Sequence, residues 1–264
     1  MKKTINISYI VLVLAFIYLP ILLLVVYSFN GGETIGVWEG FSFKWYSRLG
    51  EIGDVVLFTV ILALVSSLIA TLLGTLGAVG IFYSKRRYGK FIKGASQIPV
   101  VNSEIVTASA LVMAFMLLGL SHRSIFGLYV GHVVLSAPFV MLSVMPKLKQ
   151  MDNNLYEAAL DLGASPFQAF FKVILPEILP GILSGFMIAI TLSLDDYIIT
   201  ATLSPLEFDT ISTAVYKAIA HTTEMSNERV AVYRALTTII FLLTVAVVAV
   251  NNIRTNKKIK EKRK

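Results

Sequence analysis

Long apolar stretches alternate with short polar connections along this chain of 264 residues. A helix needs about 20 mainly apolar residues to cross the hydrocarbon core of a bilayer, so each long stretch predicts one membrane span. Six such spans are predicted, at residues 8–28, 55–82, 97–120, 125–145, 177–202 and 232–252. The pattern therefore indicates an all-α, polytopic membrane protein in which residues 1–264 form a single transmembrane domain.

The charges in the connections predict the orientation of these spans. Lys and Arg dominate connection 83–96 and the tail after residue 252, whereas connections 29–54 and 203–231 carry more of the acidic residues. Cytoplasmic loops near a membrane are rich in Lys and Arg. Both termini and the loop at about 146–176 are thus expected in the cytoplasm. The first stretch lacks an A-x-A cleavage pattern and predicts a retained helix rather than a signal peptide.

Composition agrees with a membrane protein and excludes several other classes. Hydrophobic residues make up 56% of the chain and charged residues only 15%, and the mean hydropathy is +0.76. The absence of Cys excludes disulfides, thiolate metal sites and a Cys nucleophile. The net charge of +7 lies beside apolar runs, which is typical of membrane topology and does not favour a nucleic-acid partner. His122, His132 and His221 have no metal-ligand spacing, so we expect no metal and assign them to loops or packing.

Small residues recur at helix-packing spacing in three of the spans. The positions are Gly74, Gly77 and Gly80, then Gly127 and Gly131, then Gly181 and Gly185. Such faces let two helices approach closely. We expect packing within one bundle rather than a dedicated dimer interface.

The cytoplasmic loop 146–176 is predicted to fold as helix, turn, helix. Asn154 is placed to cap the first helix, with Glu157 three residues later as an approximate capping box. Gly163 suits a left-handed C-terminal cap, and Ser165 with Pro166 suits the start of the second helix. On these local signals alone, Glu157 could be only a capping residue.

The spacing across this loop gives it a second interpretation. Glu157-Ala158-Ala159 is followed by three residues, Gly163, nine residues and then Val173-Ile174-Leu175-Pro176. This resembles the EAA loop of importer-type ABC-transporter permeases, with Val173 in place of the usual Ile. The resemblance implies a type I ABC-importer permease fold. It also implies that Glu157, Ala158, Ala159 and Gly163 dock in a cleft of an ATPase subunit and transmit its motion.

Partners and cofactors follow from the same resemblance. The chain has no G-x-x-x-x-G-K-[ST] phosphate loop, so we expect it to bind no cofactor and to depend on ATP used by a separate subunit. The implied partners are an ABC ATPase, expected as a homodimer, a second homologous permease subunit, an extracytoplasmic substrate-binding protein and the lipid bilayer. The implied location is the bacterial cytoplasmic membrane.

Two adjacent carboxylates, Asp195 and Asp196, lie late in the fifth predicted span, where ionisable residues are costly and indicate function. The sequence from Ser193 to Asp196 and the loop NGGETIGVWEGFSFKWYSRL are similar to spermidine/putrescine importer permeases, most of all to the second permease subunit of such systems. That similarity extends along nearly the whole chain and implies a polyamine cargo.

A polycationic cargo needs carboxylates and aromatic faces in place of water, so we predict a substrate pathway that includes Asp195, Asp196, Ser193, Glu104 and Trp45. Adjacent helical positions differ by about 100°, so only one Asp is expected to face the path. A structural hydrogen-bond network with Ser193, Tyr197 or a neighbouring subunit is the alternative for this pair. For Trp45 the alternative is an interfacial aromatic residue.

Other functions remain open at this stage. The same machinery could import another small solute, such as an amino acid derivative, a phosphonate or a metal complex. An intramembrane enzyme using the two carboxylates is a distant alternative, because adjacent residues on one helix point in different directions. We therefore expect a transport subunit without catalytic residues.

Overall fold

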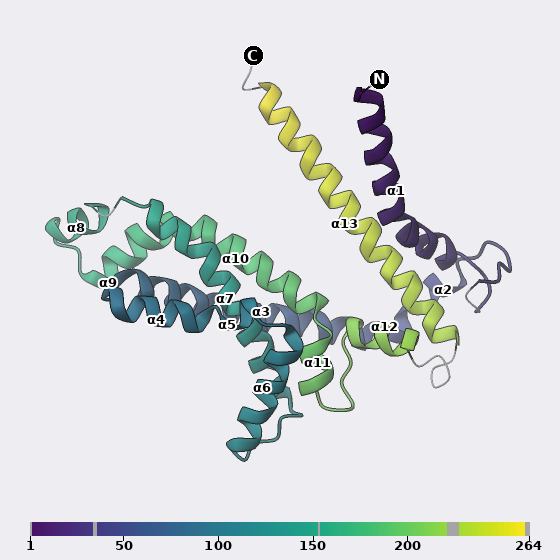
Figure 1. Ribbon diagram of the computed structural model, residues 1–264, viewed down its shortest axis with the longest axis horizontal. Helices are drawn as coiled ribbons and strands as arrows, with labels where there is room; N and C mark the ends of the chain where they lie inside the picture. Colours follow the sequence, from purple (N-terminus) through teal and green to yellow (C-terminus); the bar gives the residue numbers. More distant parts are fainter. Residues whose placement is uncertain (1, 34–35, 153, 221–226, 262–264) are drawn as a thin grey trace. The chain divides into compact units, whose positions relative to one another are not determined.

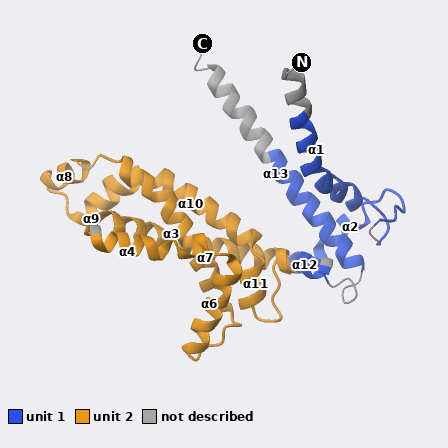
Figure 2. Ribbon diagram, viewed as in Figure 1, with its two compact units in different colours: residues 1–53, 214–264 blue, residues 54–213 orange. Residues whose placement is uncertain are grey.

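The computed structural model describes residues 2–33, 36–152, 154–220 and 227–261, and in these ranges the regular structure is helical. The chain divides into two compact units, residues 1–53 with 214–264 and residues 54–213 (Figure 2). Five described helices are long and apolar enough to cross a membrane, or six if one bent helix pair counts as a span. The single domain expected from the sequence stays a prediction.

The first unit consists of α1 (Lys2–Ser28), α2 (Lys44–Ser47), the 3₁₀ helix η1 (Leu49–Ile52) and α13 (Asn227–Glu261) (Figure 1). Helix α13 packs against α1, α2 and η1. The apolar stretch of α1 buries none of its side chains within the chain, as expected for a helix that faces lipid or a partner subunit. The connection after α1 is organised by Asn30, whose side chain bonds the backbone of Val37 at 2.6 Å and Glu39 at 2.8 Å.

The second unit is built around helices α3, α7 and α10. Its elements are α3 (Gly53–Tyr83), α4 (Arg86–Ser96), α5 (Ile98–Val101), α6 (Glu104–Leu117), α7 (Ile125–Gln150), α8 (Asn154–Asp161), α9 (Pro166–Ala169), the π-helical η2 (Phe170–Ile174), α10 (Leu175–Asp195) and α11 (Ile198–Leu203). Helix α12 (Ile211–Ala220) contains the boundary between the units. The buried side chains of α7 and α10 form the main apolar cluster, which includes Val140, Val144 and Ile178.

Glycines allow the close approach of these helices. A Cβ on Gly74 would lie 2.6 Å from the carbonyl oxygen of Ala137, and one on Gly185 would lie 3.0 Å from the Cα of Val140. A Cβ on Gly181 would lie 2.9 Å from the carbonyl oxygen of Ser143. The prediction that small residues pack helices within one bundle is therefore confirmed for these three positions. It is wrong for Gly80, where a Cβ would meet no atom of the described residues within 4 Å.

The third predicted span, 97–120, is not one helix. Its two helical parts, Arg87–Val101 and Glu104–Leu117, are bent by 115°. The break falls at two polar residues, since Asn102 has ψ 154° and Ser103 has ψ 152°, both extended. Helix α6 has 14 residues, or about 21 Å at 1.5 Å per residue, which is shorter than the hydrocarbon core of about 30 Å.

The cytoplasmic loop and the fifth span also have different bounds from those expected. Helix α7 continues to Gln150, and a continuous helical stretch runs from Pro166 to Asp195, so the connection between them is shorter than 146–176. The π-helical segment ends at Ile174, two residues before Pro176, whose missing N–H would leave a gap in an α-helical ladder. The span 177–202 is interrupted after Asp195.

Candidate functional site

The segment with the EAA spacing forms a helix that ends in a tight reversal. Gly163 has φ +86°, a left-handed conformation that favours Gly. Its N–H donates to Leu160 O at 2.9 Å, and the N–H of Ala164 donates to Ala159 O at 3.0 Å. This pair of bonds is the Schellman motif. The C-terminal cap predicted at Gly163 is therefore confirmed.

The two helix starts in this segment differ in how well they were predicted. Ser165 and Gln168 form a reciprocal capping box, as expected at Ser165 and Pro166. Asn154 is the first helical residue rather than the cap, because its N–H bonds Asp152 Oδ1 at 3.0 Å. Asp152, two residues earlier in the chain, thus provides the acceptor for this N–H group.

Helix α8 is anchored on one side and exposed on the other. The ring of Tyr156 lies 5.8 Å from that of Tyr83 and packs against the main apolar cluster. Glu157 and Ala158 are exposed, and the nearby Leu162 is 90% exposed. This segment therefore presents a partly apolar surface that the described chain leaves uncovered.

The Asp pair sits at a break between two helices. Helix α10 ends at Asp195, and Asp196 is extended with φ −63° and ψ 126° before α11 begins at Ile198. Asp side chains compete with the backbone for hydrogen bonds, which favours such breaks. The two carboxylates consequently have different surroundings.

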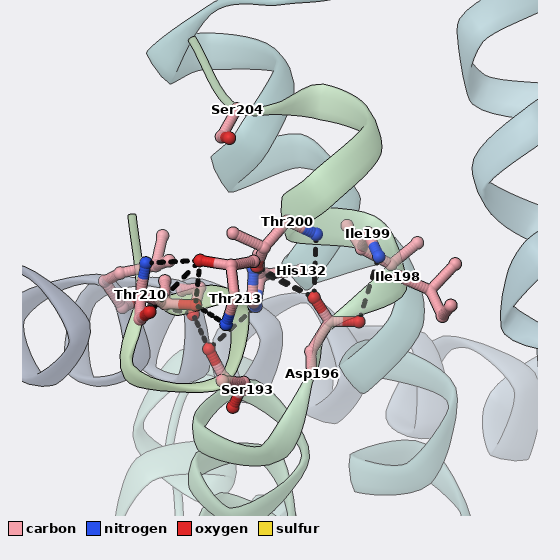
Figure 3. A network of polar contacts seen from close by, with 12 residues as sticks. His132, Ser193, Asp196, Ile198, Ile199, Thr200, Ser204, Thr210 and Thr213 are labelled. Atoms are coloured by element: carbon pink, nitrogen blue, oxygen red, sulfur yellow. Dashed lines mark hydrogen bonds and ion pairs between the residues drawn. The ribbon is translucent and has the colours of Figure 1, made fainter. Parts of the chain in front are cut away.

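Asp196 is buried and caps α11. Its Oδ1 accepts from Ile199 N at 3.1 Å, and its Oδ2 accepts from Thr200 N at 2.8 Å and Thr200 Oγ1 at 2.9 Å (Figure 3). The whole Asp196 residue is only 3% exposed. A carboxylate with three donors at a helix start is well compensated for its burial.

A buried polar chain continues from Asp196 into the unit (Figure 3). His132 of α7 contacts Thr200 Oγ1 through Nε2 at 3.1 Å and Ser193 Oγ through Nδ1 at 2.8 Å. Ser193 Oγ lies 3.1 Å from Ser66 Oγ, which donates to Leu62 O at 2.6 Å. His132 Nε2 is also 3.7 Å from Asp196 Oδ2. Four helices, α3, α7, α10 and α11, are thus joined through one network.

Two bond directions in this network are fixed by chemistry. Ser66 donates to the main-chain carbonyl of Leu62, and Thr200 donates to the carboxylate of Asp196. A neutral imidazole makes both of its contacts when one ring nitrogen donates and the other accepts, so His132 links Ser193 to Thr200.

Asp195 differs from its neighbour because its side chain is exposed. Glu104, the first residue of α6, is exposed as well and interacts electrostatically with Asp196 and Asp195. Helices α6 and α11 contact each other, which brings Glu104 toward the adjacent carboxylates of Asp195 and Asp196. Of the three side chains, Asp195 and Glu104 are exposed and Asp196 is buried.

Trp45 belongs to the first unit, whereas the three carboxylates belong to the second. It is 0% exposed, and its indole N–H donates to Asn30 O at 2.7 Å. Lys44 Nζ lies 4.4 Å from the ring centroid and Arg48 Cζ lies 5.8 Å from it. Hydrogen bonds to Glu51 and Glu228 raise the pKa of Arg48 above its ordinary value. The ring therefore already has cations of its own chain beside it.

Sequence reasoning missed His132 and Thr200 as members of the site. His132 was assigned to packing, although an ionisable residue inside a span was a usable signal. Thr200 gave no signal, because a hydroxyl in an apolar run usually bonds its own helix. Within the described residues, no group of three His, Cys, Asp or Glu residues is placed to hold a metal ion.

Comparisons with known proteins match most of the chain. Residues 70–256 match the family model described as the binding-protein-dependent transport system inner membrane component. The spermidine/putrescine transport system permease protein PotC of Haemophilus influenzae is 30% identical over 253 residues, 95% of this chain and 96% of that protein. The putrescine transport system permease protein PotI of Escherichia coli (strain K12) is 32% identical over 220 residues, 77% of this chain and 76% of that protein.

Solved structures share the fold. A bacterial ABC transporter involved in the import of the acidic polysaccharide alginate matches with a TM-score of 0.68 and 18% identity, over 95% of both chains. A bacterial alginate ABC transporter in complex with an alginate pentasaccharide-bound periplasmic protein matches with a TM-score of 0.66 and 18% identity, over 92% of this chain and 91% of that chain. At this identity the likeness concerns the fold alone.

Proposed function

Because the chain belongs to the family of binding-protein-dependent transport system inner membrane components, of which it is a multi-pass ABC-importer membrane subunit and not an enzyme, we propose that its cargo is a polyamine. The observation that carries this proposal is the 30% identity to a spermidine/putrescine permease over 95% of the chain. The carboxylates of Asp195 and Asp196 at the break between α10 and α11 support the proposal, because a polyamine carries several ammonium groups.

Asp195 is the residue of the pathway that we assign to direct contact with the cargo. Its exposed carboxylate can replace water around an ammonium group, and Glu104 is within electrostatic range to bind a second one. Alternating access would bring the cargo past both groups in turn.

Asp196 and Ser193 act as positioning residues in this proposal. The carboxylate of Asp196 is occupied by three donors, and Ser193 Oγ bonds His132. Together they hold the end of α10 in place and so fix the direction of Asp195. We leave Trp45 out of the pathway, because its ring is buried.

Coupling to ATP is assigned to the α8 segment. Glu157, Ala158 and Ala159 would lie in a cleft of the ABC ATPase, and the reversal at Gly163 would pass the motion to the helical stretch that begins at Pro166. That stretch runs without interruption to Asp195, so a push on α8 reaches the carboxylates through one helix. No cofactor is needed in this chain, since the ATPase, expected as a homodimer, uses the ATP.

The remaining partners and the orientation complete the proposal. A second homologous permease would supply the other half of the pathway, and an extracytoplasmic polyamine-binding protein would deliver the cargo. Lys and Arg in connection 83–96 support a cytoplasmic position for both termini and for α8, in the bacterial cytoplasmic membrane.

The test is uptake by the complete transporter in proteoliposomes that enclose ATP, with the binding protein and the labelled solute outside. Labelled spermidine, putrescine, an amino acid derivative, a phosphonate and a metal complex are offered in parallel with their binding proteins. We expect saturable, ATP-dependent accumulation of the polyamines alone. Accumulation of another solute with no polyamine uptake would assign the same machinery to that cargo and refute the proposal.

A further inference from the structure

A cavity of about 440 Å³ lies at one end of the second unit, away from the carboxylate group. It is lined by apolar and small residues of α3, α4 and α7 and by three lysines. The lining residues are Ile81, Phe82, Ser84, Gly89, Lys90, Lys93, Met145 and Lys149. The cavity thus combines an apolar wall with a concentrated positive charge.

The charge of this cavity is not balanced by the chain itself. The lining contains no Asp or Glu, and connection 83–96 contains none either. In the described part of the chain, none of the salt bridges involves Lys90, Lys93 or Lys149; they join Arg48 to two glutamates and His132 to Asp196. Three unpaired ammonium groups around one cavity favour an anionic occupant.

Helix α4 has the pattern of a helix that lies in a membrane interface. Tyr88, Phe91 and Ile92 recur at positions i, i+3 and i+4 and are 65%, 78% and 46% exposed. At about 100° per residue, Lys90 and Lys93 lie on the opposite face, the face that lines the cavity. An exposed apolar face beside a basic one is typical of helices that bind anionic lipid surfaces.

The narrow junction between α3 and α4 gives the cavity a fixed shape. A Cβ on Gly89 would lie 2.7 Å from Ser84 Oγ and 3.2 Å from Ile81 O. The N–H of Gly89 donates to Lys85 O at 3.0 Å, and Ser84 Oγ donates to Ile81 O at 3.0 Å. The chain therefore turns tightly from α3 into α4, which places Lys90 and Lys93 among the residues that line the cavity.

We propose that this cavity binds the phosphate headgroup of an anionic phospholipid, with the acyl chains along the apolar face of α4. Basic pockets between transmembrane helices on the cytoplasmic side bind such headgroups. The assignment to the cytoplasmic leaflet rests on the proposed orientation, whereas the binding itself depends on neither the orientation nor the cargo.

The test compares two double variants of the assembled, full-length transporter by native mass spectrometry. Lys90→Gln/Lys93→Gln removes two charges of the cavity, and the matched control Lys85→Gln/Arg87→Gln removes two charges of the same connection outside it. Each is titrated with dioleoylphosphatidylglycerol and with zwitterionic dioleoylphosphatidylcholine. Glycerol 3-phosphate serves as a soluble competitor without acyl chains.

We expect the wild type to bind phosphatidylglycerol saturably and in preference to phosphatidylcholine. The cavity variant should bind phosphatidylglycerol roughly 25-fold more weakly, at about fivefold per basic residue, and the control should stay within about twofold. Millimolar glycerol 3-phosphate should not displace the lipid.

Three results of the lipid titrations would overturn the proposal. They are equal affinity for the two lipids, equal losses in the two double variants, and full displacement by glycerol 3-phosphate, which would indicate a site for a soluble anion. Loss of the ATPase subunit from the cavity variant with lipid binding unchanged would assign the lysines to that subunit and overturn it as well.

Discussion

Removing one hydroxyl at the break between α10 and α11 should reveal how much the buried network contributes to the stability of the subunit. Thr200→Val deletes the donor that lies 2.9 Å from Asp196 Oδ2 and the oxygen that lies 3.1 Å from His132 Nε2, at nearly unchanged shape. Asp196 keeps its two backbone donors. A hydrogen bond to a charged group contributes about 1.5–3 kcal/mol, and the ring nitrogen left without a partner adds to the loss. We expect the variant to be destabilised by about 2–3 kcal/mol.

The measurement is thermal unfolding of the purified subunit in detergent. One kcal/mol corresponds to about 2–4 °C for chains of this size, so Tm should fall by about 4–12 °C. The matched control is Thr202→Val on the same helix, whose hydroxyl bonds only Ile198 O at 2.7 Å. It should change stability by less than about 0.5 kcal/mol. Equal Tm values for the two variants would refute the idea that the network stabilises the break.

Two further predictions concern helix packing and coupling. Gly185→Ala should destabilise the subunit by about 1–3 kcal/mol, because its Cβ would meet Val140 Cα at 3.0 Å. The control Gly80→Ala, whose Cβ would meet no atom within 4 Å, should be neutral or stabilising by up to about 1 kcal/mol in the same unfolding assay. An equal loss of stability in both variants would contradict the packing described. Gly163→Pro should abolish uptake and the coupled ATPase activity while leaving membrane insertion intact, because Pro cannot adopt φ +86°. Normal uptake by this variant would contradict the coupling role assigned to the α8 segment.

The unbroken long spans and the helical form of the α8 segment could be predicted because local signals determine them. Apolar runs of about 20 residues indicate most of the long helices, and Gly163 and Ser165 carry caps that act within a few residues. The close approach at Gly185 followed from small-residue spacing alone. In each of these cases the residues that decide the structure are neighbours in sequence or face one partner helix.

The breaks in the third and fifth spans could not be predicted from hydropathy. Asn102 and Ser103 are too few to interrupt an apolar window, yet they are where the chain bends. At the break after Asp195, the N–H groups of Ile199 and Thr200 bond the carboxylate of Asp196. His132, from another helix, lies 3.7 Å from that carboxylate. Such compensation depends on contacts across 64 residues of chain, from position 132 to position 196.

The contrast between the two neighbouring carboxylates tests the central claim most directly. The measurement is spermidine uptake by the reconstituted transporter, set against Tm, for Asp195→Asn and Asp196→Asn. We predict that Asp195→Asn lowers uptake at least about tenfold with Tm unchanged, because its exposed carboxylate is free to contact the cargo. Asp196→Asn should lower Tm, because an amide in this place turns a donor toward the N–H groups of Ile199 and Thr200. Full uptake by Asp195→Asn would contradict the account.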